Sequence, residues 1–213
     1  MGMMAVMSSA GSATDVDLAF LRDGVAARCT AGDAYFAAVA QELAECAAAM
    51  ADRFFAGATL LVFGSGAGAT DAQHNSVEYV HPVLPGCRAL PALSLTNDVS
   101  TVTGILGGNA PLEVYAHQLR VLGRPGDIAL AFLTSVDDAA AVRGLRAAGE
   151  GAMLTIALST GAEGVSSVAA THTFHVDSED PLVAQELHLA TYHMLWELTH
   201  IVLNHRGIAE VRR

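Results

Sequence analysis

The sequence predicts an α/β fold: a three-layer sandwich in which a mostly parallel sheet of roughly five strands lies between helices. Short apolar runs alternate along the chain with longer amphipathic segments, as strands do with the crossover helices that join them. The runs contain almost no polar residues, which is typical of parallel strands buried on both faces. With 213 residues, the chain has room for one such domain and a helical extension at its N-terminus.

The sequence predicts helices in the N-terminal part of the chain. Residues 33–55, DAYFAAVAQELAECAAAMADRFF, place apolar side chains at helical spacing around a polar face, and a shorter helix is predicted near 16–28. The preceding MGMMAVMSSAGSATD has neither the basic start nor the long apolar core of a secretory signal. We therefore predict a frayed tail over residues 1–15, a helical extension over 16–56 and the main domain over 57–213.

A strand, a turn and a helix then follow one another. The run ATLLVF ends abruptly in the glycine-rich turn GSGAG, and a helix is predicted over about 69–79. The run ALPALSL leads through a Ser/Thr/Asp loop into a helix from about residue 100. Ligands of parallel sheets bind beyond the carboxyl ends of the strands, where GSGAG falls.

The second half repeats this unit. The run DIALAFL follows the turn GRPGD and leads through TSVDD, also at a strand's carboxyl end, into a helix over 139–148. Two further strand candidates are MLTIALS and THTFHV. After DSEDP, a C-terminal helix is predicted over 182–205.

Composition excludes several classes of protein. Eleven basic against 22 acidic residues give a formal charge of −11 without any Lys/Arg cluster, which argues against nucleic-acid binding. No apolar run reaches the length of about 20 residues that a membrane span needs. The three cysteines form no metal-binding pattern, as expected of reduced thiols. We predict a cytoplasmic protein without nucleic-acid or membrane partners, whose thinly charged surface favours oligomer interfaces.

Two pairs of residues could carry chemistry. His74 and Glu78 are four residues apart, so on a helix they share one face. Gln185 and His193 are eight apart, about 80° around a helix axis at roughly 100° per residue. Each pair alone also suits an ordinary role, a surface His–Glu pair or a buried, hydrogen-bonded histidine. Together, imidazole, carboxylate and amide oxygen would suit a divalent metal, with zinc the first choice.

Four segments, in order and spacing, resemble one known family. GSGAGATDAQHNSVE, LPALSLTNDVSTVTGI, HQLRVLGRPGDIALAFLTS and AQELHLATYH look like the sugar isomerase (SIS) domain of bacterial phosphoheptose isomerases, over about residues 60–205. The resemblance implies a flavodoxin-like SIS fold and the interconversion of sedoheptulose 7-phosphate with the corresponding manno-heptose 7-phosphate. It also implies a homotetramer with active sites at subunit boundaries.

The resemblance assigns roles to the two pairs. The family loop GNGGSAADAQHFxxE lays His74 and Glu78 on metal ligands, and the later pattern adds Gln185 and His193. It also implies that Glu78 and His193 are the acid/base pair. An aldose–ketose isomerase moves a proton between neighbouring carbons through an enediol, which a carboxylate, an imidazole and a Lewis-acidic ion could support. The implied cofactor is Zn²⁺ or another divalent metal, and a ligand that is also the base must leave or share the ion during turnover.

The residues at the positions that face the substrate's phosphate in the family differ here. Three of the family's phosphate-facing serine positions are here Gly68, Leu133 and Asp138, and an arginine position is Pro82. Asp137 and Asp138 would themselves occupy the helix start that favours an anion. We predict an eroded phosphate pocket. The predicted substrate-binding residues are Gly64, Ser65, Gly66, Gly68, Asp98, Thr134 and Ser135; Asp71, also a family position, is predicted to start a helix or to hydrogen bond.

The predicted function is aldose–ketose isomerisation of a sugar or sugar phosphate through Glu78 and His193 at a zinc-capable site. One alternative is a metal-dependent hydratase, lyase or hydrolase that acts on a small unphosphorylated metabolite. Another is a non-catalytic SIS-type binding protein. The retained quartet disfavours a pure scaffold, and no basic segment that would bind DNA precedes residue 33.

Overall fold

The computed structural model describes residues 18–108, 110–133, 138–161 and 170–206. It divides into two compact units, residues 1–37 and 38–213. The described residues of the first unit all belong to helix α1 (Leu18–Phe55), which continues into the second. The two helices predicted near 16–28 and 33–55 are therefore one helix, since an isolated glycine costs a helix only about 1 kcal/mol. The predicted tail lies outside the described residues, and the domain boundary at residue 57 stays a prediction.

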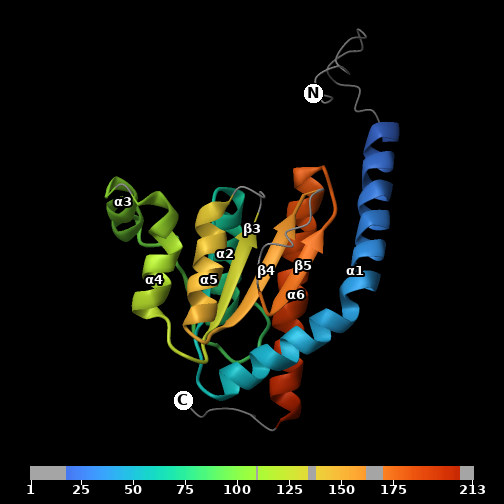
Figure 1. Cartoon of the computed structure of the whole chain (residues 1–213). Helices are drawn as coiled ribbons and strands as arrows, with labels where there is room; N and C mark the ends of the chain where they lie inside the picture. The colour runs from blue at the N-terminus through green and yellow to red at the C-terminus, as the bar shows by residue number, and fades with distance from the viewer. Residues whose placement is uncertain (1–17, 109, 134–137, 162–169, 207–213) are drawn as a thin grey trace. The chain divides into compact units, whose positions relative to one another are not determined.

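The second unit is built on a parallel sheet (Figure 1). Its five strands lie in the order β2-β1-β3-β4-β5, and every neighbouring pair is parallel. The predicted α/β sandwich with a parallel five-stranded sheet is confirmed. The strands are β1 (Leu60–Gly64), β2 (Ala92–Ser94), β3 (Ile128–Leu133), β4 (Leu154–Thr160) and β5 (His172–Val176).

Helices connect these strands, and three of the helices begin at an aspartate that caps them. Asp98, Asp138 and Asp180 each accept a backbone N–H of the helix that follows. The single helix predicted from about residue 100 is two, because Gly107 and Gly108 end the first and Pro111 opens a 3-10 turn before the second. The helices are α2 (Ala67–Val80), α3 (Val99–Gly107), η1 (Pro111–Glu113), α4 (Val114–Leu122), α5 (Ala139–Glu150) and α6 (Pro181–His205).

The sheet separates two apolar cores, because successive strand residues point to opposite faces. On one face, Phe63 packs with Tyr115 of α4 and Leu145 of α5. On the other, Phe132 contacts Tyr192 of α6, and α6 packs against α2. The second core fixes α2 and α6 beside each other, which positions the candidate site. In the described part of the chain, no helix is long and apolar enough to cross a membrane.

Candidate functional site

Three of the four predicted metal ligands meet between α2 and α6. The Nε2 atom of His74 lies 3.3 Å from Oε1 of Glu78, one turn along α2. The Nε2 atom of His193, on α6, lies 3.1 Å from the same oxygen. One nitrogen or oxygen atom from each side chain lies within 4.8 Å of the others. The packing of two helices thus brings together residues more than a hundred positions apart in the sequence.

Hydrogen bonds from α6 hold this cluster in place. The Tyr192 hydroxyl lies 2.6 Å from Nδ1 of His74, which leaves Nε2 as the ring atom that faces Glu78. The Trp196 indole donates to the backbone carbonyl of Glu78 at 3.1 Å. Burial raises the pKa of the Tyr192 phenol, and the nearby charges of Asp71 and Glu78 raise it further. The phenol therefore stays neutral and can orient His74 over the whole physiological pH range.

His193 has a buried nitrogen without a hydrogen bond. Its Nε2 atom is close to the Glu78 carboxylate, but it makes no hydrogen bond there, and the described residues offer it no other partner. Such atoms are uncommon in folded proteins and suggest a group that completes the site. Two imidazole nitrogens and a carboxylate oxygen are ligands that suit zinc and similar divalent ions. The His74 side chain remains 44% exposed, so the cluster is open to solvent.

Gln185, the fourth predicted ligand, is bound to Asp71. Its amide nitrogen donates to both carboxylate oxygens, each 3.3 Å away. Burial raises the pKa of Asp71, while the Gln185 hydrogen bond and the nearby His74 partly offset that effect. Because the amide nitrogen binds Asp71, the amide oxygen of Gln185 is the atom that could bind a metal. Its participation with the other three residues stays a prediction.

The backbone structure explains why glycines occupy the turn after β1. A Cβ on Gly64 would lie 2.8 Å from the Phe132 carbonyl oxygen and 2.9 Å from two backbone atoms of Gly68. Gly66, which precedes α2, has φ of 56°, a conformation that favours glycine. Gly68 is buried against this turn. Close packing of β1, β3 and α2 therefore accounts for Gly64 and Gly68, whatever they bind.

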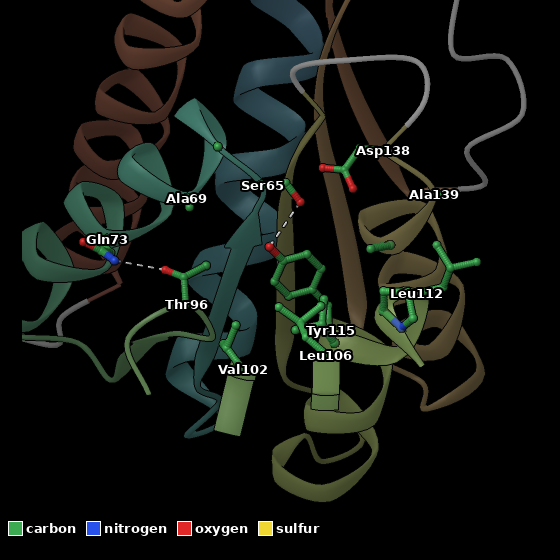
Figure 2. Close-up of a pocket in the computed structure, with 14 residues that line it drawn as sticks. Ser65, Ala69, Gln73, Thr96, Val102, Leu106, Leu112, Tyr115, Asp138 and Ala139 are labelled. Carbon is green, nitrogen blue, oxygen red and sulfur yellow. Dashed lines mark hydrogen bonds between the residues drawn. The ribbon is translucent and has the colours of Figure 1, made fainter. Parts of the chain in front are cut away.

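A cavity of about 480 Å³ opens beside this turn, between α2, α3, α4 and α5 (Figure 2). The Tyr115 hydroxyl donates to the Gly64 carbonyl at 2.5 Å, and Ser65 Oγ lies 3.3 Å from the same phenol oxygen. Of the described residues that line the cavity, none is Lys, Arg or His. These residues are Ser65, Gly66, Ala69, Gln73, Thr96, Val102, Leu106, Pro111, Leu112, Val114, Tyr115, Asp138, Ala139 and Ala140.

Asp98, another predicted binding residue, lies outside this cavity. Asp98 accepts from the Thr101 hydroxyl and, as the cap of α3, from the backbone N–H groups of Thr101 and Ser100. The hydroxyl bond lowers the pKa of its carboxyl most, and the backbone bonds lower it further. Asp98 lines a separate cavity of about 450 Å³ next to His117. Its contact with substrate stays a prediction. Thr134 and Ser135 lie outside the described residues.

Comparison with known proteins identifies the family. The SIS domain family matches residues 31–160 of the chain. The phosphoheptose isomerase of Desulfovibrio desulfuricans is 36% identical over 194 residues, which cover 90% of each chain. The chain belongs to the phosphoheptose isomerase family of SIS domains. The phosphoheptose isomerase of Aquifex aeolicus is 34% identical over 169 residues, 79% of this chain and 88% of that one.

Solved structures of this SIS family agree. A phosphoheptose isomerase from Francisella tularensis superposes with a TM-score of 0.80 at 25% identity, over 88% of this chain and 100% of that one. The phosphoheptose isomerase from Neisseria gonorrhoeae superposes with a TM-score of 0.76 at 25% identity, over 84% of this chain and 97% of that one. The predicted resemblance and the SIS fold are confirmed. The prediction of an isomerase is confirmed at the level of the family.

Sequence reasoning missed two tyrosines of this SIS domain. Tyr192 orients His74, and Tyr115 bonds both Ser65 and the Gly64 carbonyl. Tyr192 precedes His193 and follows Gln185 by seven residues, a helical repeat that could have placed it near α2. Tyr115 offered no such signal, because it reaches the turn from a helix that was not predicted as a separate element.

His188 makes the stability of this SIS domain depend on pH. Burial lowers the pKa of His188 to about 4 from an ordinary 6.5, against a partial opposing effect from the Ser159 carbonyl. The folded state therefore favours the neutral ring. This contribution is fully present above pH 6.5 and is lost as the pH falls toward 4, a loss of about 3 kcal/mol in the free energy of unfolding.

Urea unfolding at pH 7 and pH 4.5 measures this effect. The variant His188→Gln cannot acquire the charge and is expected to lose clearly less stability across this interval than the wild type. His205→Gln, at an exposed position, is the matched control and should behave as the wild type. An identical pH dependence in His188→Gln and wild type would show that His188 does not cause it.

Proposed function

We propose that the protein is an aldose–ketose isomerase that acts on a sugar or sugar phosphate through Glu78 and His193. The observation that carries this proposal is the placement of both side chains, 3.1 Å apart, beside His74. In this reaction a base removes a proton from the carbon beside a carbonyl. An acid donates a proton to the carbonyl oxygen, on which negative charge develops. The relatives are named phosphoheptose isomerases, which supports the same class of reaction.

Glu78 is proposed as the base. Its carboxylate is almost buried, with only 8% of the residue exposed, so few water molecules compete with a substrate for its oxygens. The carboxylate takes the proton from one carbon and returns it to the neighbouring one. Trp196 keeps the Glu78 backbone fixed during this transfer through its bond to the carbonyl.

His193 is proposed as the acid. Its imidazole would donate a proton to the carbonyl oxygen as the enediol forms and would remove one from the adjacent hydroxyl as the enediol collapses. Among the described residues its Nε2 atom makes no hydrogen bond, so the exchange would displace none. Because the ring lies against Glu78, one substrate could contact both groups at once.

A divalent metal fits the same residues. His74, Glu78 and His193 would hold it, with the Gln185 oxygen as the proposed fourth ligand. When bound, the ion would supply Lewis-acid polarisation of the carbonyl, and Glu78 and His193 would have to release or share it in order to act as base and acid. The Tyr192 bond to Nδ1 of His74 favours this role, since it holds Nε2 toward the other two residues.

We further propose that the family's phosphate pocket is eroded here. Leu133 is buried in the core next to α5, so its side chain offers nothing to a ligand. Gly68 has no side chain, and Asp138 presents a carboxylate that repels anions. The absence of Lys and Arg from the described cavity lining also favours the alternative of a metal-dependent hydratase, lyase or hydrolase on an unphosphorylated metabolite.

Assembly as a homotetramer in the cytoplasm belongs to the same proposal. Apolar side chains remain exposed on the two helices that form the cluster: Val77 and Val80 on α2, and Met194 and Ile201 on α6. Surfaces of this kind often pack against another copy of the chain. Such packing would cover the open side of the cluster.

Exchange of the substrate's α proton tests the reaction. The protein is incubated in D₂O with a panel of ketoses and ketose phosphates and with divalent metals, and deuterium incorporation is followed by NMR. We expect incorporation that depends on protein and metal. If no member of the panel exchanges its α proton, the isomerase assignment is wrong and the alternative chemistry takes its place.

A further inference from the structure

We propose that Asp71 is a positioning residue of the metal site. It holds the Gln185 amide so that the amide oxygen is the end offered to the ion, and it adds a negative charge behind that ligand. This inference rests on the proposed function, because it takes Gln185 as the fourth ligand of a divalent metal. It goes further in giving a role to a residue that acts through Gln185. Its basis is the hydrogen bonding between α2 and α6.

Asp71 lies on the face of α2 that forms the cluster. Asp71, His74 and Glu78 follow one another at intervals of three and four residues, which places them in one row along the helix. Three hydrogen bonds join this row to α6: from Gln185 to Asp71, between Tyr192 and His74, and from Trp196 to the Glu78 carbonyl. The bond between Asp71 and Gln185 therefore belongs to the same helix contact that assembles the cluster.

The Asp71 carboxylate determines which way the Gln185 amide turns. Only the amide nitrogen carries hydrogens, whereas the oxygens of an ionised carboxylate can only accept. The nitrogen lies 3.3 Å from each carboxylate oxygen, as this rule requires. A reversed amide would place its own oxygen against both carboxylate oxygens, where it would be repelled. The amide oxygen of Gln185 is consequently the end that is turned away from Asp71.

Asp71 also brings a charge close to the site without occupying a coordination position. Two imidazoles, one carboxylate and one amide offset only one of the two charges of a divalent ion. The residue is only 4% exposed, so water screens its carboxylate less than it would screen one at the surface. The hydrogen bond to this carboxylate polarises the amide and makes its oxygen a better ligand.

The zinc affinity of the whole protein, measured by competition with a chromophoric chelator, tests this inference without any turnover. Asp71→Asn keeps the shape of the side chain but removes its charge, and its amide can pair with either end of the Gln185 amide. We expect zinc binding to weaken by about 10- to 100-fold, the usual effect of losing the partner of a metal ligand. Gln185→Ala, which removes the ligand itself, should weaken binding at least as much.

Asp127→Asn is the matched control. Asp127 is also a buried aspartate that accepts two hydrogen bonds, from the backbone N–H groups of Thr59 and Arg124. It directly precedes β3, whereas the cluster lies on α2 and α6. The control variant should therefore bind zinc as tightly as the wild type.

The double variant Asp71→Asn, Gln185→Glu separates positioning from folding. It places the amide at position 71 and the carboxylate at position 185, so the hydrogen bond and the charge of the pair are both kept. We expect it to bind zinc about as tightly as the wild type. A loss of affinity caused by damage to the fold would not be reversed by a change at position 185.

Three results would overturn the inference: wild-type zinc affinity in Asp71→Asn, wild-type affinity in Gln185→Ala, or a loss in Asp71→Asn that the double variant does not restore. A wild type that binds no zinc would overturn it together with the proposed metal site. The expected loss and recovery in a protein that exchanges no α proton would uphold the role of Asp71 and reject the isomerase.

Discussion

Replacing Glu78 with glutamine is expected to lower the rate of α-proton exchange by about 10²- to 10⁴-fold, the range typical of a lost general base. The amide has the shape of the carboxylate but cannot accept a proton from carbon. The backbone carbonyl of residue 78 still accepts the hydrogen bond from the Trp196 indole, so the fold should persist. The loss should appear in kcat, because Glu78 accepts the proton in the transition state. Substrate binding precedes this step, so KM should change little.

Glu150→Gln is the matched control for this variant. Glu150 is exposed at the end of α5, so the same chemical change there should leave the exchange rate unchanged. Deuterium incorporation followed by NMR measures all three proteins, and circular dichroism establishes that each is folded. A Glu78→Gln variant that exchanges the α proton at the wild-type rate would exclude Glu78 as the base.

Replacing Gly64 with alanine is expected to destabilise the protein by about 1–3 kcal/mol or more, the usual cost of overpacking a core. The new Cβ would be only 2.8 Å from the Phe132 carbonyl oxygen and equally hindered by the backbone of Gly68. None of these atoms is the end of a flexible side chain, so β1, β3 or α2 must move. Because α2 carries His74 and Glu78, we expect reduced activity as well.

Gly149→Ala in α5 is the control for this substitution. A Cβ there meets nothing within 4 Å, and alanine favours a helix over glycine by about 1 kcal/mol, so the variant should be as stable as the wild type or more so. Urea unfolding compares the three proteins. If Gly64→Ala unfolded at the wild-type midpoint, the close approach of β1 and α2 would not constrain this position.

Local patterns predicted the parts of the site that lie on one helix. His74 and Glu78 could be paired because four residues make about one helical turn. The approach of His193 could not be derived in this way, since it depends on how α6 packs against α2. The family resemblance supplied that pairing in place of geometry. The same limit hid Tyr192, whose bond to His74 also crosses between these helices.

The parallel sheet was predictable because its strands are almost continuously apolar. The region between β2 and β3 was not, because two glycines and a proline divide one apparent helix into α3, η1 and α4. The predicted binding loop shows that one feature can have two explanations. Its glycines were interpreted as ligand contacts, whereas Gly64 and Gly66 are already explained by close packing and by a positive φ.

The central claim is that His74, Glu78 and His193 form a metal-dependent catalytic centre. Its most direct test is the metal content, by mass spectrometry, of protein purified without a polyhistidine tag, compared with the double variant His74→Ala, His193→Ala. We predict about one divalent ion per chain in the wild type and its loss in the variant, as expected of a site built from these ligands. A wild-type protein without metal, even after incubation with zinc, would contradict the claim.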